Sequence, residues 1–388
     1  MPCYYEFFAG GGMARAGLGA GWQCLFANDI DRKKAASYAT NWGTRELVVA
    51  DVASLKTTDI PGVADLAWAS FPCQDLSLAG SGAGLSGDRS GTFWLFWQLV
   101  RRLGREDRSP TLIVLENVCG ALASHGGKDF AAISAAIARE NYRFGAVVVD
   151  AVHFLPQSRP RLFIICAKQG VRIPEGIMAL HADDLWHPPH LTNAYGKLSR
   201  AAKASWVWWR LPLPRPRHTT FSDIIETEPK GVEWHQPAET RYLLSLMSPI
   251  NRKKVEAARK LGRLVVGGIY KRTRVDERGR RAQRAEVRFD DVAGCLRTPV
   301  GGSSRQTILL VNGRDIRSRL LSPREAARLM GLPDNYRLPE NYNEAYHLAG
   351  DGVAVPVVRH LAKNVLEPLV FSGEAHEKDA EWAACVSS

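Results

Sequence analysis

Short apolar runs of β-strand type alternate with helical patterns through the first 170 residues, and this alternation limits the possible folds more than any other feature. Parallel strands need crossover connections, which helices usually supply while they cover both faces of the sheet. The sequence therefore predicts an α/β domain with a doubly wound, mostly parallel sheet. Predicted strands cover residues 4–8, 23–28, 47–50, 66–70, 112–116, 146–149 and 162–166, and predicted helices cover residues 30–41, 92–103 and 129–141.

The alternation stops near residue 186, where prolines and tryptophans become frequent. We predict a first domain over residues 1–185, a second and less regular domain over 186–344, and a C-terminal segment, 345–388, that returns to the first domain. Strand-type residues cover 264–270 within the second domain. Helical order resumes at Ser322, because Pro323 suits the first helical position and Glu325 completes the spacing of a capping box.

The charge of the chain is concentrated in the second domain. The 388 residues include 51 Lys or Arg and 40 Asp or Glu, a net charge of +11. Residues 252–288 alone hold 14 basic and 4 acidic side chains, a net +10. Such a concentrated positive charge attracts polyanions, so the composition favours a nucleic acid as partner.

The cysteines and the apolar runs exclude several other classes of protein. Seven widely spaced cysteines without any CxxC spacing argue against a disulfide framework and against a zinc site, so we expect no bound metal. No leader-type segment and no apolar run near the roughly 20 residues of a membrane span is present. We therefore expect a cytoplasmic monomer without a membrane partner.

A glycine-rich stretch, with Gly10 and Gly12 at its centre, directly follows the first predicted strand and opens a helix. Glycines let the backbone turn tightly and approach a ligand at a helix N-terminus. The stretch departs from the strict dinucleotide pattern, because Arg15 stands where the third glycine belongs. A plain tight turn is therefore an open alternative for this stretch.

Two aspartates extend the glycine-rich signal. Asp29 ends the second predicted strand, where an acidic side chain in such folds accepts hydrogen bonds from ribose hydroxyls, and Asp51 follows the third. Either residue alone is equally explained as a helix cap. Together they predict a cofactor containing a nucleoside, bound across the carboxyl ends of the strands.

Reactive side chains follow later strands. Cys73 comes after the fourth strand and Glu116 ends the fifth, so both are expected at the ligand edge of the sheet. A thiolate and a carboxyl group with a raised pKa form a nucleophile and acid pair. Arg159 and Arg161 precede the last strand and suit recognition of a phosphate or a pyrimidine oxygen.

In this order, the motifs make the chain resemble the bacterial DNA cytosine-5 methyltransferases along nearly its whole length. That family places its target-recognition domain where this chain carries residues 186–344. The resemblance rests on Phe8 to Gly12, Asp29, Asp51, Pro72-Cys73-Gln74, Glu116-Asn117-Val118, Gln157-x-Arg159-x-Arg161, Arg324 to Leu329 and Gly350 to Pro356.

The resemblance implies a mechanism and a set of roles. Cys73 would add to C6 of a flipped-out cytosine in double-stranded DNA while Glu116 protonates N3, and C5 would take the methyl group of S-adenosyl-L-methionine, leaving S-adenosyl-L-homocysteine. Arg159 would hold the cytosine or its phosphate, with Arg161 beside it, and Asn117 would orient the segment that carries Cys73. The implied cofactor residues are Phe8, Gly10, Gly12, Asp29, Ile30, Asp51, Val52, Pro72 and Asp351, and the implied DNA-binding residues are Gln74, Ser77, Lys271, Arg272, Arg274 and Arg305.

One departure and two alternatives accompany this interpretation. The closing segment reads Gly350-Asp351-Gly352, where the family usually has Asn at the second position, so a carboxylate is expected near the methionine end of the cofactor or at a helix cap. An RNA cytosine-5 methyltransferase is the first alternative, but Asp75-Leu76-Ser77 differs from the Cys-Phe-Thr pattern of that branch. The second is a DNA-binding protein that has lost catalysis, which the retained Cys73 and Glu116 disfavour.

Overall fold

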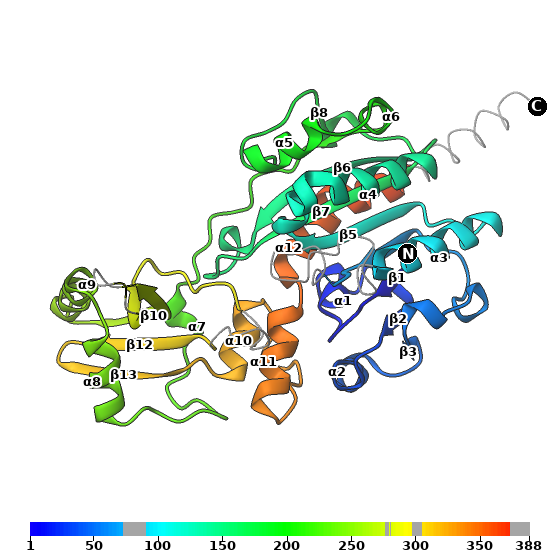
Figure 1. Cartoon of the computed structure of the whole chain (residues 1–388). Helices are drawn as coiled ribbons and strands as arrows, with labels where there is room; N and C mark the ends of the chain where they lie inside the picture. The colour runs from blue at the N-terminus through cyan, green and yellow to red at the C-terminus, as the bar shows by residue number, and fades with distance from the viewer. Residues whose placement is uncertain (73–90, 276–278, 280, 297–304, 373–388) are drawn as a thin grey trace, which may run out of the picture. The chain divides into compact units, whose positions relative to one another are not determined.

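The computed structural model of the chain describes residues 1–72, 91–275, 279, 281–296 and 305–372 (Figure 1). The chain divides into two compact units: Met1–Asp150, Pro160–Pro214 and Val355–Ser388 form the first, and Ala151–Arg159 with Arg215–Ala354 form the second. The observed boundaries fall after Pro214 and Ala354, later in the chain than the predicted boundaries after residues 185 and 344. The reason for the first shift is that β9 (Trp208–Trp209) pairs with β8 (Met178–Ala179) and that the Val207 amide donates to the Phe144 carbonyl in β6.

The first unit contains a seven-stranded sheet that confirms the predicted fold class. Its order is β3-β2-β1-β4-β5-β7-β6, with parallel pairs through β5 and antiparallel pairing of β7 to both neighbours. All seven predicted strands are present, with ends shifted by a few residues. The strands are β1 (Cys3–Phe7), β2 (Gln23–Asp29), β3 (Leu47–Val49), β4 (Leu66–Ala69), β5 (Leu112–Val118), β6 (Tyr142–Asp150) and β7 (Pro160–Lys168).

Helices cover this sheet and also confirm the sequence pattern. The Asp31 side chain accepts hydrogen bonds from two amides at the start of α2, which explains where that helix begins. The C-terminal helix α12 packs closely on α1. A Cβ atom at Gly17 would lie 2.3 Å from Cβ of Val358, so this contact requires a glycine in α1. The helices of this unit are α1 (Met13–Leu18), α2 (Arg32–Trp42), α3 (Gly91–Arg105), α4 (Lys128–Arg139), α5 (Pro189–Gly196), α6 (Arg200–Ala204) and α12 (Val355–Leu361).

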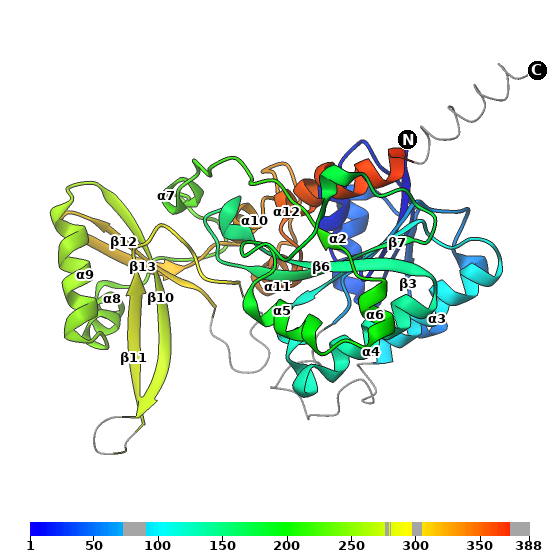
Figure 2. The ribbon, with the colours of Figure 1, turned by 90° about the horizontal axis from the view of Figure 1, so that it is seen from above.

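The second unit is built on a four-stranded antiparallel sheet in the order β11-β10-β12-β13 (Figure 2). One face of the sheet packs on α8 and α9 through a cluster that includes Leu243, Val255, Ile269 and Val287. The elements are α7 (Phe221–Ile224), α8 (Pro237–Ser245), α9 (Pro249–Lys260), β10 (Leu264–Val275), β11 (Arg281–Arg288), β12 (Thr307–Asn312), β13 (Asp315–Leu320), α10 (Pro323–Leu329) and α11 (Tyr342–Asp351).

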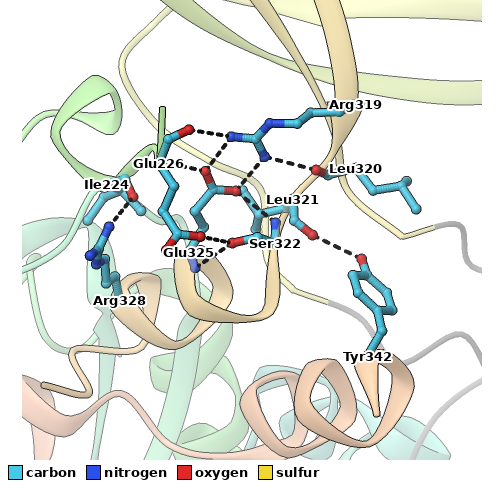
Figure 3. A network of polar contacts seen from close by, with 9 residues as sticks. All are labelled: Ile224, Glu226, Arg319, Leu320, Leu321, Ser322, Glu325, Arg328 and Tyr342. Atoms are coloured by element: carbon cyan, nitrogen blue, oxygen red, sulfur yellow. Dashed lines mark hydrogen bonds and ion pairs between the residues drawn. The ribbon is translucent and has the colours of Figure 1, made fainter. Parts of the chain in front are cut away.

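The predicted capping box starts α10 and belongs to a larger buried network (Figure 3). The Ser322 hydroxyl accepts from the Glu325 amide, and the Glu325 carboxylate accepts from the Ser322 amide at 2.7 Å. The same carboxylate receives two hydrogen bonds from Arg319, at 2.6 and 2.7 Å, and one from the Glu226 amide at 2.7 Å. Neither Arg319 nor Glu325 is exposed, so this pair joins β13, α10 and the segment after α7 in the core of the second unit.

Among the described residues, no helix is both long enough and apolar enough to cross a membrane.

Candidate active site

The parallel strands of the first unit end at one edge of the sheet, and the predicted site residues follow those ends. In the ladder, Phe7 pairs with Asn28 and with Ala69, and Ala69 pairs with Leu115. The residues that follow these positions therefore share one edge, as ligand-binding residues do in doubly wound sheets. Predicted residues at this edge are Phe8, Gly10, Gly12, Asp29, Ile30, Asp51, Val52, Pro72 and Glu116, whereas Cys73, Gln74 and Ser77 lie outside the described residues.

In the glycine-rich loop after β1, Gly10 and Gly12 lack a side chain for different reasons. Phe8, Gly10 and Gly12 all have positive φ angles, of 57°, 56° and 75°. A Cβ atom at Gly12 would lie 2.4 Å from Nε1 of Trp42, so the absence of a side chain is required for packing there. A Cβ atom at Gly10 would meet no described atom within 4 Å. The backbone at Gly10 is therefore open to close approach by a ligand.

Asp29 holds this loop in place. Its Oδ2 accepts from the Gly10 amide at 2.7 Å and its Oδ1 accepts from the Asp31 amide at 2.8 Å. Burial raises the pKa of Asp29 above its usual value. A carboxylate has about four lone-pair sites, so these two bonds leave capacity for hydroxyl groups of a ligand. The next residue, Ile30, is 62% exposed and offers an apolar surface beside that carboxylate.

Asp51 serves as a cap, which was one of the two roles considered for it. Its Oδ1 accepts from the Ala53 amide at 2.9 Å at the start of a short 3₁₀ helix, Val52–Ser54. The side chain is exposed, whereas Val52 is buried. Its further role in binding a cofactor stays a prediction.

Glu116 and Arg161 form an ion pair at this edge. Nε of Arg161 lies 3.3 Å from Oε1 of Glu116, and the side chains are 15% and 9% exposed. The pair forms because β5 and β7 run antiparallel, with Val118 opposite Arg161. Cys119 follows β5 as well, but burial raises the pKa of its thiol to about 11. Cys119 is thus a poor nucleophile at neutral pH, which leaves Cys73 as the candidate.

Asn117 links this pair to the segment that leads to Cys73. Its Nδ2 donates to the Phe71 carbonyl at 3.2 Å, and its Oδ1 accepts from the Val118 amide at 2.8 Å. Phe71 is buried and its ring lies 5.5 Å from that of Phe93. The bond fits the expectation that Asn117 orients the segment carrying Cys73.

The structure separates the two arginines that the sequence placed together. Arg159 belongs to the second unit and is buried there. Its guanidinium donates to the carbonyls of Gly350, Gly352 and Leu296 at 2.8, 2.7 and 3.3 Å. These bonds hold the end of α11, whereas Arg161 pairs with Glu116. Within the first unit Arg161 is therefore an arginine that accompanies Glu116, and contact of Arg159 with cytosine or its phosphate stays a prediction.

Sequence reasoning missed Glu6, a carboxylate in the middle of β1. Glu6 is buried, and burial raises its pKa to about 8 against the opposing effect of the positive charge of Arg15. Arg15 donates from Nη1 to the Tyr38 hydroxyl at 2.9 Å and its Cζ lies 5.3 Å from the ring centroid of Trp42. The available signal was a single acidic residue inside an apolar strand directly before the glycine-rich loop.

The remaining predicted residues lie in the second unit. Asp351 is the exposed last residue of α11, and Gly352 takes the C-cap position, so Asp351 itself is not the cap. Arg305 hydrogen-bonds to Asn343, and its Cζ lies 5.1 Å from the ring centroid of Tyr342. Strand β10 carries Lys271, Arg272 and Arg274, and the side chains of Lys271 and Arg272 are exposed.

Comparison with known proteins adds to this geometry. The family model described as C-5 cytosine-specific DNA methylase matches residues 4–367. The chain is 25% identical to the type II methyltransferase M.HhaI of Haemophilus parahaemolyticus over 95% of each protein. It is 26% identical to M.Bsp6I of Bacillus sp. (strain RFL6) over 90% of this chain and 93% of that protein. The fold is similar to the crystal structure of the S. pombe Dnmt2 methyltransferase, with a TM-score of 0.59 and 16% identity over 95% of this chain and 99% of that one.

Proposed function

This chain belongs to the C-5 cytosine-specific DNA methylase family, and we propose that it transfers a methyl group from S-adenosyl-L-methionine to C5 of a flipped-out cytosine in a specific duplex sequence. The protein is a cytosine-5 DNA methyltransferase. The observation that supports the proposed mechanism is the Glu116–Arg161 pair beside Asn117, which holds the segment before Cys73. This arrangement would supply an acid and a cation at the edge of the sheet where the segment leading to Cys73 begins.

Cys73 is the proposed nucleophile. Its thiolate adds to C6 of the cytosine, the electron pair of the C5–C6 double bond shifts through C4 to N3, which takes a proton, and C5 becomes the nucleophilic carbon of an enamine. Removal of the base from the helical stack is required, because C6 is inaccessible within a duplex. After methylation, loss of the C5 proton and departure of the Cys73 thiolate restore the double bond and the enzyme.

Glu116 is the proposed acid. It donates a proton to N3 of the cytosine as Cys73 adds, so that negative charge does not accumulate on the ring. Arg161 contacts the Glu116 side chain at 3.3 Å and would donate to an adjacent pyrimidine oxygen. Asn117 fixes the backbone at Phe71, two residues before the nucleophile.

The residues of the same edge fit the proposed cofactor. S-adenosyl-L-methionine, when bound, supplies an electrophilic methyl group on a sulfonium. Asp29 would accept from the ribose hydroxyls, and the exposed side chain of Ile30 would cover one face of the adenine ring. Asp51 would accept from the adenine amine, and the open space at Gly10 would admit the rest of the molecule.

DNA is favoured over RNA as substrate by two observations. The second unit carries the net charge of +10 in residues 252–288, and the relatives with 25% and 26% identity are type II methyltransferases. The Dnmt2 structure is too distant in sequence to support more than the fold.

The test is a methyl-transfer assay with tritiated S-adenosyl-L-methionine. The substrates are a duplex DNA library with many cytosine contexts and a mixture of transfer RNAs. We expect label only in DNA, and bisulfite sequencing of the product should give one short target sequence. Label in RNA alone, or no label in either, would contradict the proposed function. Trapping of a covalent complex with duplexes containing 5-fluorocytosine, absent in Cys73→Ser, tests the adduct.

A further inference from the structure

Strands β10 and β11 extend beyond the rest of the second unit's sheet as a two-stranded ribbon (Figure 2). Residues 264–269 of β10 pair with β12, whereas, within the part of the chain that the structure describes, residues 270–275 pair only with β11. The ribbon formed by residues 270–275 and 281–286 holds five basic residues and one acidic residue. A two-stranded ribbon of this kind fits the width of the major groove of B-DNA.

The register of the ribbon separates its side chains onto two faces. Ile269 pairs with Val287 and Lys271 with Ala285, and Ile269, Val287 and Ala285 belong to the core beneath α8 and α9. Arg281, opposite Val275, shares this helix-side face because alternate residues of a strand point the same way. The other face, which we call the arginine face, carries Tyr270, Arg272, Arg284 and Glu286.

The arginine face contains an arrangement that is unfavourable without an anion. Arg272 and Arg284 are direct cross-strand partners, and like charges directly opposite one another destabilise a sheet. Glu286 offsets part of this repulsion, since its Oε2 lies 3.5 Å from Nε of Arg272. Arg284 is exposed, and among the described residues no acidic side chain forms an ion pair with it. A bound phosphate or base edge would relieve the repulsion.

The helix-side face is less suited to a duplex. Helices α8 and α9 cover that face at the root of the ribbon, so a duplex approaching that face would meet them first. The cluster that holds α8 and α9 lies on the helix-side face, whereas Arg272 and Arg284 of the arginine face are exposed. We propose that the ribbon binds in a groove of the duplex with the arginine face toward the DNA, using Arg272 and Arg284 as paired contacts. This inference rests on the proposed function and adds the surface that holds the substrate.

Two arginines of β11 provide a matched test. Arg284 lies on the arginine face and Arg281, three residues away, lies on the helix-side face, and both side chains are exposed. Arg284→Gln and Arg281→Gln remove the same charge from the same strand. The probe is a labelled duplex that contains the target sequence found with the wild-type protein, titrated between 50 and 200 mM salt.

We expect Arg284→Gln to weaken binding about tenfold and to lower the slope of log affinity against log salt by about one. Arg281→Gln should weaken binding less than about threefold, as expected for a charge that attracts DNA without contact. Arg272→Gln with Arg284→Gln should lower the slope by about two, and Arg284→Lys should restore the slope but not the full affinity. The affinity for S-adenosyl-L-methionine and the thermal unfolding midpoint should match the wild type in every variant.

Equal losses in Arg281→Gln and Arg284→Gln would overturn the assignment of a docked face and leave only general attraction. Wild-type affinity in the double variant would exclude the ribbon as a DNA surface. Both outcomes are separate from failure of the proposed function, because the wild-type protein must first bind and methylate the duplex. If it labels only RNA, the function is wrong whatever the ribbon variants do.

Discussion

Two arginine–glutamate pairs occupy comparable positions next to strands, one in each unit, and they differ in burial and geometry. Arg319 and Glu325 are unexposed, and the guanidinium meets both carboxylate oxygens at 2.6 and 2.7 Å. Arg161 and Glu116 are 15% and 9% exposed, and the contact runs from Nε to one oxygen at 3.3 Å. The Glu325 carboxylate also accepts hydrogen bonds from the Ser322 and Glu226 amides, so this pair joins three segments of the chain.

The comparison separates a structural pair from the pair that we propose to be reactive. A buried charge that loses its partner is strongly destabilising, because the remaining charge has neither water nor a counter-ion. A pair at the ligand edge of a sheet loses less stability, since solvent reaches it, but its carboxyl group can exchange protons with a substrate. Each of the following predictions tests this contrast, in order of decreasing effect.

The largest effect is expected for Cys73→Ser. Turnover should fall at least about 10⁴-fold, because a hydroxyl is a far weaker nucleophile than a thiolate. Without the nucleophile, the proposed acid Glu116 also has no step to assist. The free energy of unfolding should stay within about 0.5 kcal/mol of the wild type, because serine and cysteine are nearly the same size. Single-turnover methyl transfer and urea unfolding measure the two quantities, and substantial residual transfer would remove Cys73 from the mechanism.

Glu116→Gln should lower turnover about 10³-fold, because general acid catalysis contributes 10²- to 10⁴-fold. Loss of the ion pair should cost less stability than the loss of Glu325, because Arg161 is 15% exposed and meets Glu116 through a single contact of 3.3 Å. The same two assays apply. A variant that loses several kcal/mol of stability while its folded fraction stays active would show that Glu116 is a structural residue like Glu325.

Glu325→Gln should show the reverse pattern. Removing the carboxylate leaves Arg319 buried without its counter-ion, so the free energy of unfolding should fall by about 3 to 5 kcal/mol. Glu256→Gln is the matched control, because Glu256 and Arg259 form an exposed pair in the same unit and should contribute less than about 0.5 kcal/mol. Similar losses in the two variants would mean that the buried network does not hold the second unit together.

Glu6 provides a third case, a buried carboxylate with a pKa raised to about 8. Its pKa in the unfolded chain is close to the ordinary 4.5, so the unfolded state loses this proton first as pH rises. The stability contributed by protonated Glu6 is complete below about pH 4.5 and declines up to about pH 8, by at most about 1.4 kcal/mol per pH unit. Urea unfolding between pH 5 and 8 should show this decline in the wild type and a flatter profile in Glu6→Gln. Parallel profiles would place the Glu6 pKa near its ordinary value.

The smallest effect is expected for Asp351→Asn. A carboxylate at the last position of α11 opposes the helix dipole, so the neutral amide should raise stability by about 0.3 to 1 kcal/mol. Calorimetry with S-adenosyl-L-methionine and S-adenosyl-L-homocysteine should give an unchanged ratio of affinities. A ratio that shifts toward the product would instead assign the Asp351 carboxylate to the sulfonium charge of the donor.

Much of the fold and of the site could be predicted because the relevant signals are local. Apolar spacing predicted all seven strands of the large sheet, and Ser322 with Glu325 predicted the start of α10. Residues that directly follow buried strands, such as Asp29 and Glu116, were predicted at one edge because parallel strands end together. These inferences need only neighbouring residues in the chain.

The tertiary structure alone decided which of these residues meet. Arg159 and Arg161 are two positions apart, yet Arg161 pairs with Glu116 across the antiparallel β5–β7 ladder while Arg159 binds carbonyls near the end of α11. Lys271 and Arg272 are adjacent and were predicted to act together, but alternation along β10 sends them to opposite faces. Composition specified the charges and the motifs specified the strand ends, but strand direction, register and burial are set by residues far apart in the chain, and these decide which charges face one another.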